Sequence, residues 1–562
     1  MKRNGKAFFG CLAVALGLAR SVIAGEAPVS GLSDVHSWQR WEVSLTSSNN
    51  YANAYAAVDL HAEFFGPAGQ TLSARGFWDG GRTFGIRCAF PEAGTWRWRT
   101  ACSDAANAGL HDQSGVVEIR AYTGANALYR HGLLKVSENA RYLTHRDGTP
   151  FLWVGDTPWA AFIAATQSEW ESYVQDRKAK KFTVLQLHCG DGFLPRDRDR
   201  NGNLPFNGSG TALQWDPAYW QGAEQKIQYA NEQGILCFVC AVRQPAKSGI
   251  FPWDDAGQVR LFARNLAARL MGNMVVYSPV ADDLWTSQAD ECGEALRAAT
   301  SRHLVTAHPR FFLDSAKAFL GKGYTDFAGT QTGAGWIGDP YKGEKCFPWD
   351  GRLVCRNAIE WPQMLRGMMP RKPVLNLEAA HDARTLQEED PKYFSPPYPP
   401  RLSRSSAWLS FLSGAMGYTY GCFGVWNWGQ PITWSGPIWD FPTAVSQPSS
   451  TQMKYLAEFF SGIEWWRLEP CHDLIRNQSS GWLEKMVLSK SASGDLAVAY
   501  LPDNPNITLD MSSFAGSMTA RWFNPVTNNS QIELASVANV GSQTFVKPAG
   551  WTDAVLVLSG RN

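Results

Sequence analysis

The chain has 562 residues, which is more than one ordinary domain holds, and 44% of them are apolar, enough for a large buried core. Its 52 Lys and Arg residues nearly balance 51 Asp and Glu residues, so the composition excludes a strongly basic protein that binds nucleic acid or anionic membranes. The 25 Trp, 29 Phe and 17 Tyr residues mainly indicate core packing. They also favour a carbohydrate ligand, because aromatic rings stack on the apolar faces of sugars.

The first 24 residues have the features of a signal peptide. Lys2, Arg3 and Lys6 form a basic start, residues 8–19 are an apolar stretch, and small residues up to Ala24 fit a cleavage site. The apolar stretch is too short to cross a bilayer as a helix. We therefore predict a protein without membrane insertion that is exported to the periplasm or the extracellular space.

Export would permit disulfide bonds, and ten cysteines remain after removal of residues 1–24. Two pairs are close enough in sequence to suggest bridges, Cys88 with Cys102 and Cys346 with Cys355. The pairing stays open, because ten cysteines permit many connectivities.

Residues 30–121 alternate polar and apolar positions in short runs separated by turn residues, without helical periodicity of useful length. This pattern predicts an N-terminal antiparallel β-sandwich. Residues 465–562 show short strands again, so we expect a second, C-terminal β-sandwich there.

Between these regions, residues 125–462 alternate short apolar strands with helical segments such as 217–234 and 257–272, as βα units do. Eight strands in about 300 residues predict a (β/α)8 barrel. A doubly wound sheet is the second choice, since no G-x-G-x-x-G follows any strand. The predicted strands are 150–156, 182–188, 235–242, 274–280, 303–309, 326–332, 373–378 and 417–424.

The active site of such a barrel lies at the carboxyl ends of its strands, and three predicted strands lead into acids. Asp282 and Asp283 follow strand 4, Glu378 ends strand 7 and Asp156 ends strand 1. Glycoside hydrolysis needs two carboxyl groups, one to protonate the leaving oxygen and one to attack or to activate water. A structural role is the alternative to the catalytic interpretation, since Asp156 can cap the following helix and Glu378 can form an ion pair.

Five long segments resemble a known family: 142–160 (LTHRDGTPFLWVGDTPWAA), 216–234, 303–309 (HLVTAHP), 372–378 (KPVLNLE) and 404–428. Together they look like the apiosidase-like glycoside hydrolases, glycoside hydrolase family 140 and its relatives. The segment WQRWEVSL…FWDGG…FPEAGTWRWR resembles a β-sandwich of unknown function that precedes this barrel. The segment WWRLEPCHDLI…GDLAVAYLP…ARWFNP resembles a C-terminal domain of the collagen-binding type.

The resemblance implies a (β/α)8 barrel whose catalytic pair is an aspartate after strand 4 and a glutamate after strand 7. Glu378 falls on the glutamate of K-P-V-x-x-x-E, and Asp282 takes the aspartate position, with Asp283 as its rival. Relatives read W-I-L-G-G-D at strand 4. This chain has Tyr277-Ser-Pro-Val-Ala-Asp282 instead, so a proline enters the strand and larger residues replace both glycines.

On this reading Asp282 is the general acid/base and Glu378 the nucleophile of a retaining glycosidase. Their carboxyl groups would then lie about 5–5.5 Å apart, against roughly 6.5–9.5 Å in inverting enzymes. The founding activity of the family implies release of apiose from a pectic side chain, as one candidate substrate among several.

Residues at the other strand ends are expected to bind the sugar, because barrel geometry gathers them around one mouth. A lone histidine at such a place is more often structural, so the group carries more weight than its members. The predicted substrate-binding residues are Asp156, Trp159, His188, His308, Gln331, Tyr420 and Trp426.

The long loop 189–215 after strand 2 contains the opening of a calcium-binding pattern, D-x-D-x-N-G, at Asp197, Asp199 and Asn201. Its twelfth position is Gly208 and not the bidentate Glu that such loops need, which favours a solvated substrate loop. Hydrolysis itself is expected to require no cofactor, because two carboxyl groups supply the chemistry.

The sequence thus predicts an exported glycoside hydrolase that cleaves O-glycosidic bonds in a plant or microbial polysaccharide. The altered strand 4 motif favours the alternative, a non-catalytic carbohydrate- or matrix-binding protein on a degenerate barrel. The residues leave open the sugar, its linkage, exo or endo action, and the oligomeric state.

Overall fold

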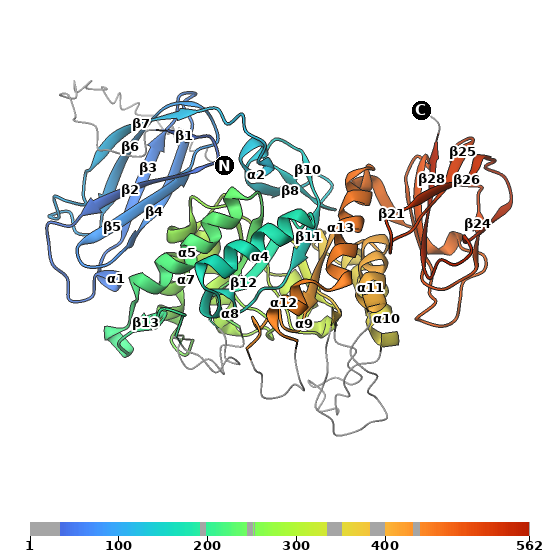
Figure 1. Cartoon of the computed structure of the whole chain (residues 1–562). Coiled ribbons are helices and arrows are strands. Elements are labelled where there is room, and N and C mark those ends of the chain that lie inside the picture. Colours follow the sequence, from blue (N-terminus) through green and yellow to red (C-terminus); the bar gives the residue numbers. More distant parts are fainter. Residues whose placement is uncertain are drawn as a thin grey trace, which may run out of the picture.

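The computed structural model consists of three parts in chain order, shown from blue to red in Figure 1. It describes residues 34–190, 198–243, 251, 253–333, 351–382, 400–430 and 439–560. The predicted signal peptide, residues 1–24, lies outside the described residues.

The N-terminal part is built from seven strands in the order β1-β7-β6-β3-β4-β5-β2. β4 turns the corner of a sandwich, since Thr71–Arg75 pairs with β3 and Gly76–Trp78 pairs with β5. A Cβ at Gly76 would overlap Leu60, so glycine is required at the bend. The elements are β1 (Val35–His36), β2 (Arg40–Thr46), α1 (Ala54–Ala57), β3 (Leu60–Phe65), β4 (Thr71–Trp78), β5 (Thr83–Ala89), β6 (Gly94–Cys102) and β7 (Ser114–Arg120).

The predicted disulfide between Cys88 and Cys102 is not formed, and both residues are buried free thiols. The cause is the strand order: Cys88 lies on β5, which pairs with β2 and β4, whereas Cys102 lies on β6, which pairs with β3 and β7. The second predicted pair includes Cys346, which lies outside the described residues.

A short connection leads into the barrel. It contains α2 (Ala127–His131) and the antiparallel sheet β10-β9-β8, and the side chain of Asn126 accepts a hydrogen bond from Leu128 N to cap α2. The strands are β8 (Leu134–Val136), β9 (Leu143–His145) and β10 (Pro150–Phe151).

The central part is a curled parallel sheet, as the predicted barrel requires. Its order is β16-β15-β12-β11-β20-β18-β17, and β11 pairs with both β12 and β20, which joins the first predicted strand to the last. The strands are β11 (Trp153–Asp156), β12 (Val184–His188), β15 (Leu236–Cys240), β16 (Val275–Ser278), β17 (Ala328–Gln331), β18 (Val374–Glu378) and β20 (Gly417–Cys422), with β19 (His381–Asp382) beside β20.

The fifth predicted strand, 303–309, lies between β16 and β17 without forming a continuous ladder. It makes single bridges, one of them between Tyr277 and Val305. Side-chain hydrogen bonds replace some of the backbone bonds between these strands. Ser278 Oγ accepts from His308 N at 3.0 Å, and Thr306 Oγ1 donates to Phe327 O at 2.6 Å. The segment still closes the sheet, which gives the (β/α)8 architecture.

Helices surround the strands of the barrel (Figure 1). Their starts follow capping rules: Thr166 and Glu169 form a capping box on α4, and Asp216 caps α5, which begins with a proline. The helices are α3 (Ala161–Ala164), α4 (Gln167–Ala179), α5 (Pro217–Glu232), α7 (Ala256–Leu270), α8 (Ser287–Ala299), α9 (Leu313–Leu320), α10 (Gly351–Gly367), α11 (Pro400–Leu412), α12 (Phe441–Val445) and α13 (Pro448–Ser461).

The C-terminal part contains a sheet in the order β21-β22-β23-β28-β25-β26 and the pair β24-β27, around a core with Trp522 and Phe545. A 3₁₀ turn, η4 (Trp465–Arg467), connects it to the barrel. The strands are β21 (Leu468–Pro470), β22 (Val487–Ser491), β23 (Leu496–Leu501), β24 (Asn506–Asp510), β25 (Met518–Phe523), β26 (Ser530–Val537), β27 (Ser542–Val546) and β28 (Ala554–Gly560).

Buried ion pairs join the three parts. Glu224 of α5 pairs with Arg87 of β5 at 2.6 Å and with Arg269 of α7, which also bonds Asp79 at 2.7 Å. On the other side Arg404 of α11 donates two hydrogen bonds of 2.8 Å to Asp553 of the C-terminal part.

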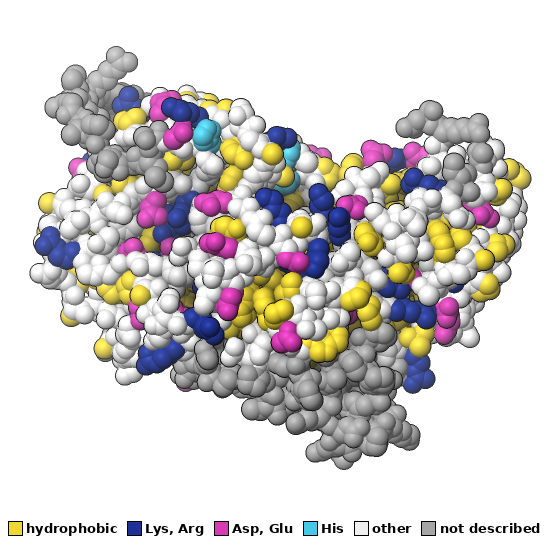
Figure 2. All heavy atoms as spheres, in the orientation of Figure 1, with side chains coloured by type: hydrophobic (Ala, Val, Ile, Leu, Met, Phe, Trp, Pro, Cys, Tyr) yellow, Lys and Arg dark blue, Asp and Glu magenta, His cyan; other side chains and the backbone are white. Residues whose placement is uncertain are grey.

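The face in Figure 2 carries Lys and Arg side chains interspersed with Asp and Glu, with no large field of one sign. This agrees with the balanced composition. Among the helices of the described residues, none has the length and apolar character needed to cross a membrane.

Candidate active site

Glu378 is the last residue of β18, next to Gln331 at the end of β17. The register of these strands shifts at Thr330 and Gln331, which brings Gln331 opposite Glu378. Gln331 Nε2 donates a hydrogen bond of 2.7 Å to Glu378 Oε1. The Glu378 side chain is 14% exposed, so this carboxylate is anchored on one oxygen and still reaches a solvent-accessible space.

His308 lies between the two predicted catalytic acids. Its Nδ1 accepts a hydrogen bond from Asp282 N at 3.2 Å, and its Nε2 is 3.5 Å from Glu378 Oε2. Burial lowers the pKa of His308 to about 4, so the ring is neutral at pH 7. Because Nδ1 is the acceptor, the single ring proton resides on Nε2, which lies near Glu378 without forming a hydrogen bond to it.

Asp282 lies four residues beyond the end of β16. Ala281 continues the parallel pairing, with its N–H donating to Val242 O at 2.8 Å and a bridge to Arg243. Asp282 then adopts φ of +50°, a left-handed conformation that Asp tolerates better than most residues. Its carboxylate is 3.2 Å from Arg243 Nη2.

Asp283, the rival acid, points to a different environment. Its Oδ1 accepts from Leu284 N at 2.8 Å, and its carbonyl accepts from Arg310 N at 2.8 Å and from Ser315 Oγ at 3.2 Å. These bonds fix the turn that follows Asp282. The geometry therefore favours Asp282 over Asp283 as the acid beside His308.

Arg243 is a site residue that sequence reasoning missed. It follows the third strand, and its guanidinium lies 4.9 Å from the ring centre of Trp426 while pairing with Asp282. The strand-end rule that selected the other residues could have selected it, since it comes directly after the apolar run 235–242.

Three buried rings form one wall of the site. Trp159 stacks on His188 with centroids 5.9 Å apart and meets His308 edge-on at 5.0 Å. Trp426 lies beside Trp159, because the carbonyl of Trp426 accepts a hydrogen bond from the next residue, Ala160 N, at 2.9 Å. The structure thus brings together Trp159, His188, His308, Gln331 and Trp426 with Asp282 and Glu378.

His381 of β19 also belongs to this group, although sequence reasoning assigned it no role. Its Nδ1 is 3.8 Å from Glu378 Oε1. A Cβ at Gly421 of β20 would overlap its ring, so that glycine makes room for the imidazole. A two-residue strand gives too short a pattern for its direction to be predicted.

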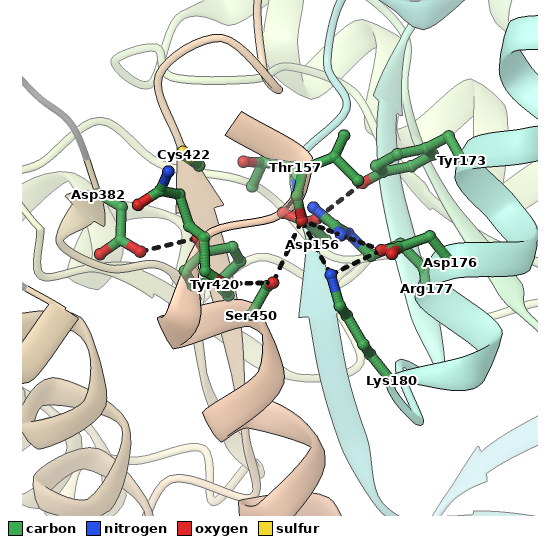
Figure 3. A network of polar contacts seen from close by, with 12 residues as sticks. Asp156, Thr157, Tyr173, Asp176, Arg177, Lys180, Asp382, Tyr420, Cys422 and Ser450 are labelled. Atoms are coloured by element: carbon green, nitrogen blue, oxygen red, sulfur yellow. Dashed lines mark hydrogen bonds and ion pairs between the residues drawn. The ribbon is translucent and has the colours of Figure 1, made fainter. Parts of the chain in front are cut away.

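The expectation that Asp156 and Tyr420 bind the sugar is wrong. Both side chains are fully buried on the outer side of the sheet, in the polar network of Figure 3. Asp156 Oδ2 accepts from Tyr173 at 2.7 Å and pairs with Arg177, both from α4, and Tyr420 donates to Asp382 Oδ2 at 2.8 Å.

Side-chain alternation explains this outcome. Trp153 of β11 packs inside the barrel against Phe238 and Phe327, with centroids 5.9 and 6.0 Å apart. Asp156, three positions further along the strand, therefore points outward to the helices. Its carboxylate is a buried counter-charge for Arg177 and not a group of the cleft.

The calcium pattern is only partly described, because Asp197 lies outside the described residues. Asp199 Oδ1 accepts from Asn201 N at 2.9 Å and from Asn203 N at 2.8 Å, and Oδ2 accepts from Asn203 Nδ2 at 3.0 Å. Within the described ranges, no group of three or more His, Cys, Asp and Glu side chains is arranged to hold a metal ion.

Three family models match the chain. "Apiosidase-like, catalytic domain" matches residues 137–467, "Domain of unknown function (DUF5060)" matches 34–103, and "Putative collagen-binding domain of a collagenase" matches 470–559. No curated protein matches the sequence significantly.

Solved structures give the same fold. A structure described as "Glycoside hydrolase" has a TM-score of 0.66 and 21% identity, covering 76% of this chain and 97% of that one. A glycoside hydrolase family 5 structure from Bacteroides vulgatus ATCC 8482 has a TM-score of 0.66 and 19% identity, covering 77% and 93%. A third, described as a "putative glycoside hydrolase" from the same organism, has a TM-score of 0.68 and 16% identity, covering 94% and 99%.

The first family model spans the barrel, its helices and every residue of the site described above. The segment 137–467 is more than half of the 562 residues. The protein therefore belongs to the apiosidase-like family of glycoside hydrolases.

Proposed function

We propose that the protein is an exported, retaining glycoside hydrolase that uses Glu378 as nucleophile and Asp282 as general acid/base on a plant or microbial polysaccharide. The observation that carries the proposal is the position of His308, which touches the backbone of Asp282 and faces Glu378. The backbone after strand 4 and the side chain at the end of strand 7 thus converge on one imidazole, which supports a pair of acids on either side of a sugar.

The proposed reaction has two displacement steps. Glu378 Oε2 attacks the anomeric carbon while Asp282 gives its proton to the leaving oxygen, so that a covalent glycosyl ester forms as the glycosidic bond breaks. Asp282 then removes a proton from water, which attacks the same carbon and releases Glu378. The amide of Gln331 holds one oxygen of Glu378 in position for both steps, and the His308 ring packs 3.5 Å from the other.

Arg243 has a role in this scheme because it contacts Asp282. The acid must be protonated before the first step and is a carboxylate after it. A guanidinium next to Asp282 stabilises the carboxylate that forms as the leaving group departs. We therefore assign Arg243 to the acid/base half of the mechanism.

Trp159 and Trp426 supply the apolar surfaces for the sugar in this proposal, and His188 lies behind Trp159. Aromatic rings of this kind orient a pyranose or furanose by contact with its C–H face. The substrate is an oligo- or polysaccharide. Apiose release from a pectic side chain, and with it family 140, is one proposed identity.

Export and independence from cofactors are further parts of the proposal. The basic and apolar start of residues 1–24 supports export. Two carboxyl groups and water suffice for hydrolysis, so activity is expected to survive treatment with a chelator. A fall of the melting temperature in EDTA would instead support calcium near Asp197, Asp199 and Asn201.

A second candidate function is carbohydrate or matrix binding without catalysis. The proline and two larger residues that replace the relatives' glycines before Asp282 favour it, and so does the C-terminal match to a collagen-binding description. Binding of glycans without turnover would support this function.

Product release from a panel of pectic, arabinan and bacterial glycans tests the proposal. The wild type is compared with Glu378→Gln and Asp282→Asn, and Asp283→Asn serves as the matched control next to the acid. We expect about 10³-fold or greater loss in the first two variants and less than about tenfold in the control. Equal activity in all four proteins would reject the assigned site.

A further inference from the structure

A small cavity lies at the end of the barrel opposite to Glu378. It is lined in part by Arg141 and Tyr142 before β9, Arg366 of α10, and Trp465 and Trp466 of η4. Gly414, which also lines the cavity, precedes β20, whereas Trp426 follows that strand. Because the strands are parallel, the cavity opens on the amino-terminal face, and the six residues of β20 separate it from the active site by about 20 Å.

The cavity is formed where the barrel meets the C-terminal part. Among the lining residues, Tyr142 follows β8 in the sequence and Trp466 precedes β21. Figure 1 shows these two strands on the same side of the barrel. Tyr142 and Trp465 bring the two segments together, with ring centroids 5.9 Å apart in an edge-on contact. Ligand sites are common at such domain boundaries.

Positive charge collects around this cavity. Arg366 pairs with Glu469, but Arg141 only donates its Nη1 proton to Arg366 O at 3.1 Å. Within the described ranges no carboxylate lies within 4 Å of the Arg141 guanidinium. Burial is the main cause that lowers the pKa of Arg141; Arg366 and Arg371 lower it further, and Glu469 acts against them.

The shape and lining of the cavity restrict the ligand. Its volume of about 30 Å³ holds a carboxylate group or two waters and is too small for a sugar ring. Tyr142 and Trp466 are partly exposed beside it and offer apolar ring surface. Gly414 has φ of +99°, and a Cβ there would press on Arg366 Cδ at 2.8 Å, so glycine keeps this guanidinium at the cavity wall.

We propose that this cavity is a second glycan-binding site, separate from the active site, which takes the carboxylate of a uronic acid unit. Arg141 binds the carboxylate through its remaining N–H groups, and the sugar ring lies outside the cavity against Trp466 and Tyr142. An acidic polysaccharide would then be held on the amino-terminal face while another part of it enters the cleft. The inference rests on the proposed function only in that the ligand is a glycan.

Calorimetric titration with a short oligogalacturonate tests the site. The host protein is the full chain with Glu378→Gln, which prevents turnover. In this host, Arg141→Gln and Trp466→Ala are each expected to weaken binding at least tenfold. Arg97→Gln removes an exposed arginine of β6 and serves as the control, which is expected to change the affinity for the oligogalacturonate less than twofold. The methyl ester of the same oligosaccharide, which lacks the charge, is expected to bind the host at least tenfold more weakly.

Several outcomes would overturn the inference: equal affinity in Arg141→Gln and Arg97→Gln, equal affinity for acid and ester, or no binding by the host. Arg141→Lys separates charge from folding, because it keeps a cation and is expected to retain part of the affinity. The hydrolysis assay on wild-type protein is independent of this titration, so failure of one is distinguishable from failure of the other.

Discussion

At the scale of single residues, the site is organised around the oxygens of Glu378. Gln331 donates a hydrogen bond to one oxygen, and the ring of His308, whose Nδ1 accepts from Asp282 N, lies 3.5 Å from the other. A nucleophile needs one oxygen aligned with the anomeric carbon, and donors that hold the carboxylate plane supply that alignment without changing its charge.

Gln331→Ala tests this arrangement. Removing a hydrogen bond to a charged group costs about 1.5–3 kcal/mol, so kcat is expected to fall about 10- to 100-fold with little change in KM. Thr330→Val is the matched control, since the neighbouring Thr330 hydroxyl is buried without a hydrogen-bond partner in the described structure. Equal kcat in the two variants, measured on a glycan that the wild type cleaves, would contradict the role of Gln331.

The strand-end rule predicted much of the site from sequence because parallel strands deliver their last residues to one mouth. It placed Asp282, His308, Gln331 and Glu378 together. It failed for Asp156, because successive side chains of a strand point alternately into the barrel and toward the helices. Which of the two directions a residue takes depends on the exact position at which the strand starts, and the sequence does not give that position. Arg243 was missed although it directly follows the predicted strand 235–242, because the rule was applied to acids, His, Gln and aromatic residues and not to arginine.

At the scale of elements, β19 links the site to the helices behind it. It carries His381 toward Glu378 and Asp382 toward the outer layer, where Asp382 accepts from Ser403 of α11 and from Tyr420 of β20. Alternation along only two residues thus connects the cleft to the buried network of Figure 3.

Asp382 makes the stability of this region depend on pH. Burial raises its pKa to about 6, against opposing hydrogen bonds from Ser403, Ser449 and Tyr420. The folded state holds this proton more tightly than the unfolded chain, so the associated stability is complete below about pH 4 and is lost as the pH rises through about 6. The stability lost in this way is about 3 kcal/mol.

Melting temperatures of the wild type and Asp382→Asn between about pH 4 and 7 check this sign. The asparagine has no proton to lose, so the variant is expected to gain stability relative to the wild type as the pH rises across this window. Parallel pH profiles for the two proteins would show that Asp382 does not control the transition.

At the scale of the whole molecule, buried charges fix the N-terminal sandwich to the barrel. Glu224 lies between Arg87 and Arg269, with side chains at most 6% exposed. Burial alone would raise the pKa of Glu224, but the two guanidinium groups lower it, so the carboxylate stays charged at the interface. Such a contact holds orientation, because either partner alone would be a buried, uncompensated charge.

Glu224→Gln is expected to destabilise the folded protein by about 1.5–3 kcal/mol, because Arg87 and Arg269 each lose one of two carboxylate partners and keep only Glu42 and Asp79. Glu291→Gln is the control, since its pair with Arg260 is 36–52% exposed and is worth at most about 1 kcal/mol. Scanning calorimetry compares the two variants. An equally small effect in both would show that the sandwich docks by apolar contacts.

The most direct test of the nucleophile assignment is rescue of Glu378→Ala by azide. Removing the carboxylate leaves space on that face of the sugar, where azide can attack the anomeric carbon while Asp282 still protonates the leaving group. We expect a glycosyl azide with inverted anomeric configuration, identified by NMR. A glycosyl azide of retained configuration, or unchanged hydrolysis without azide, would contradict Glu378 as the nucleophile.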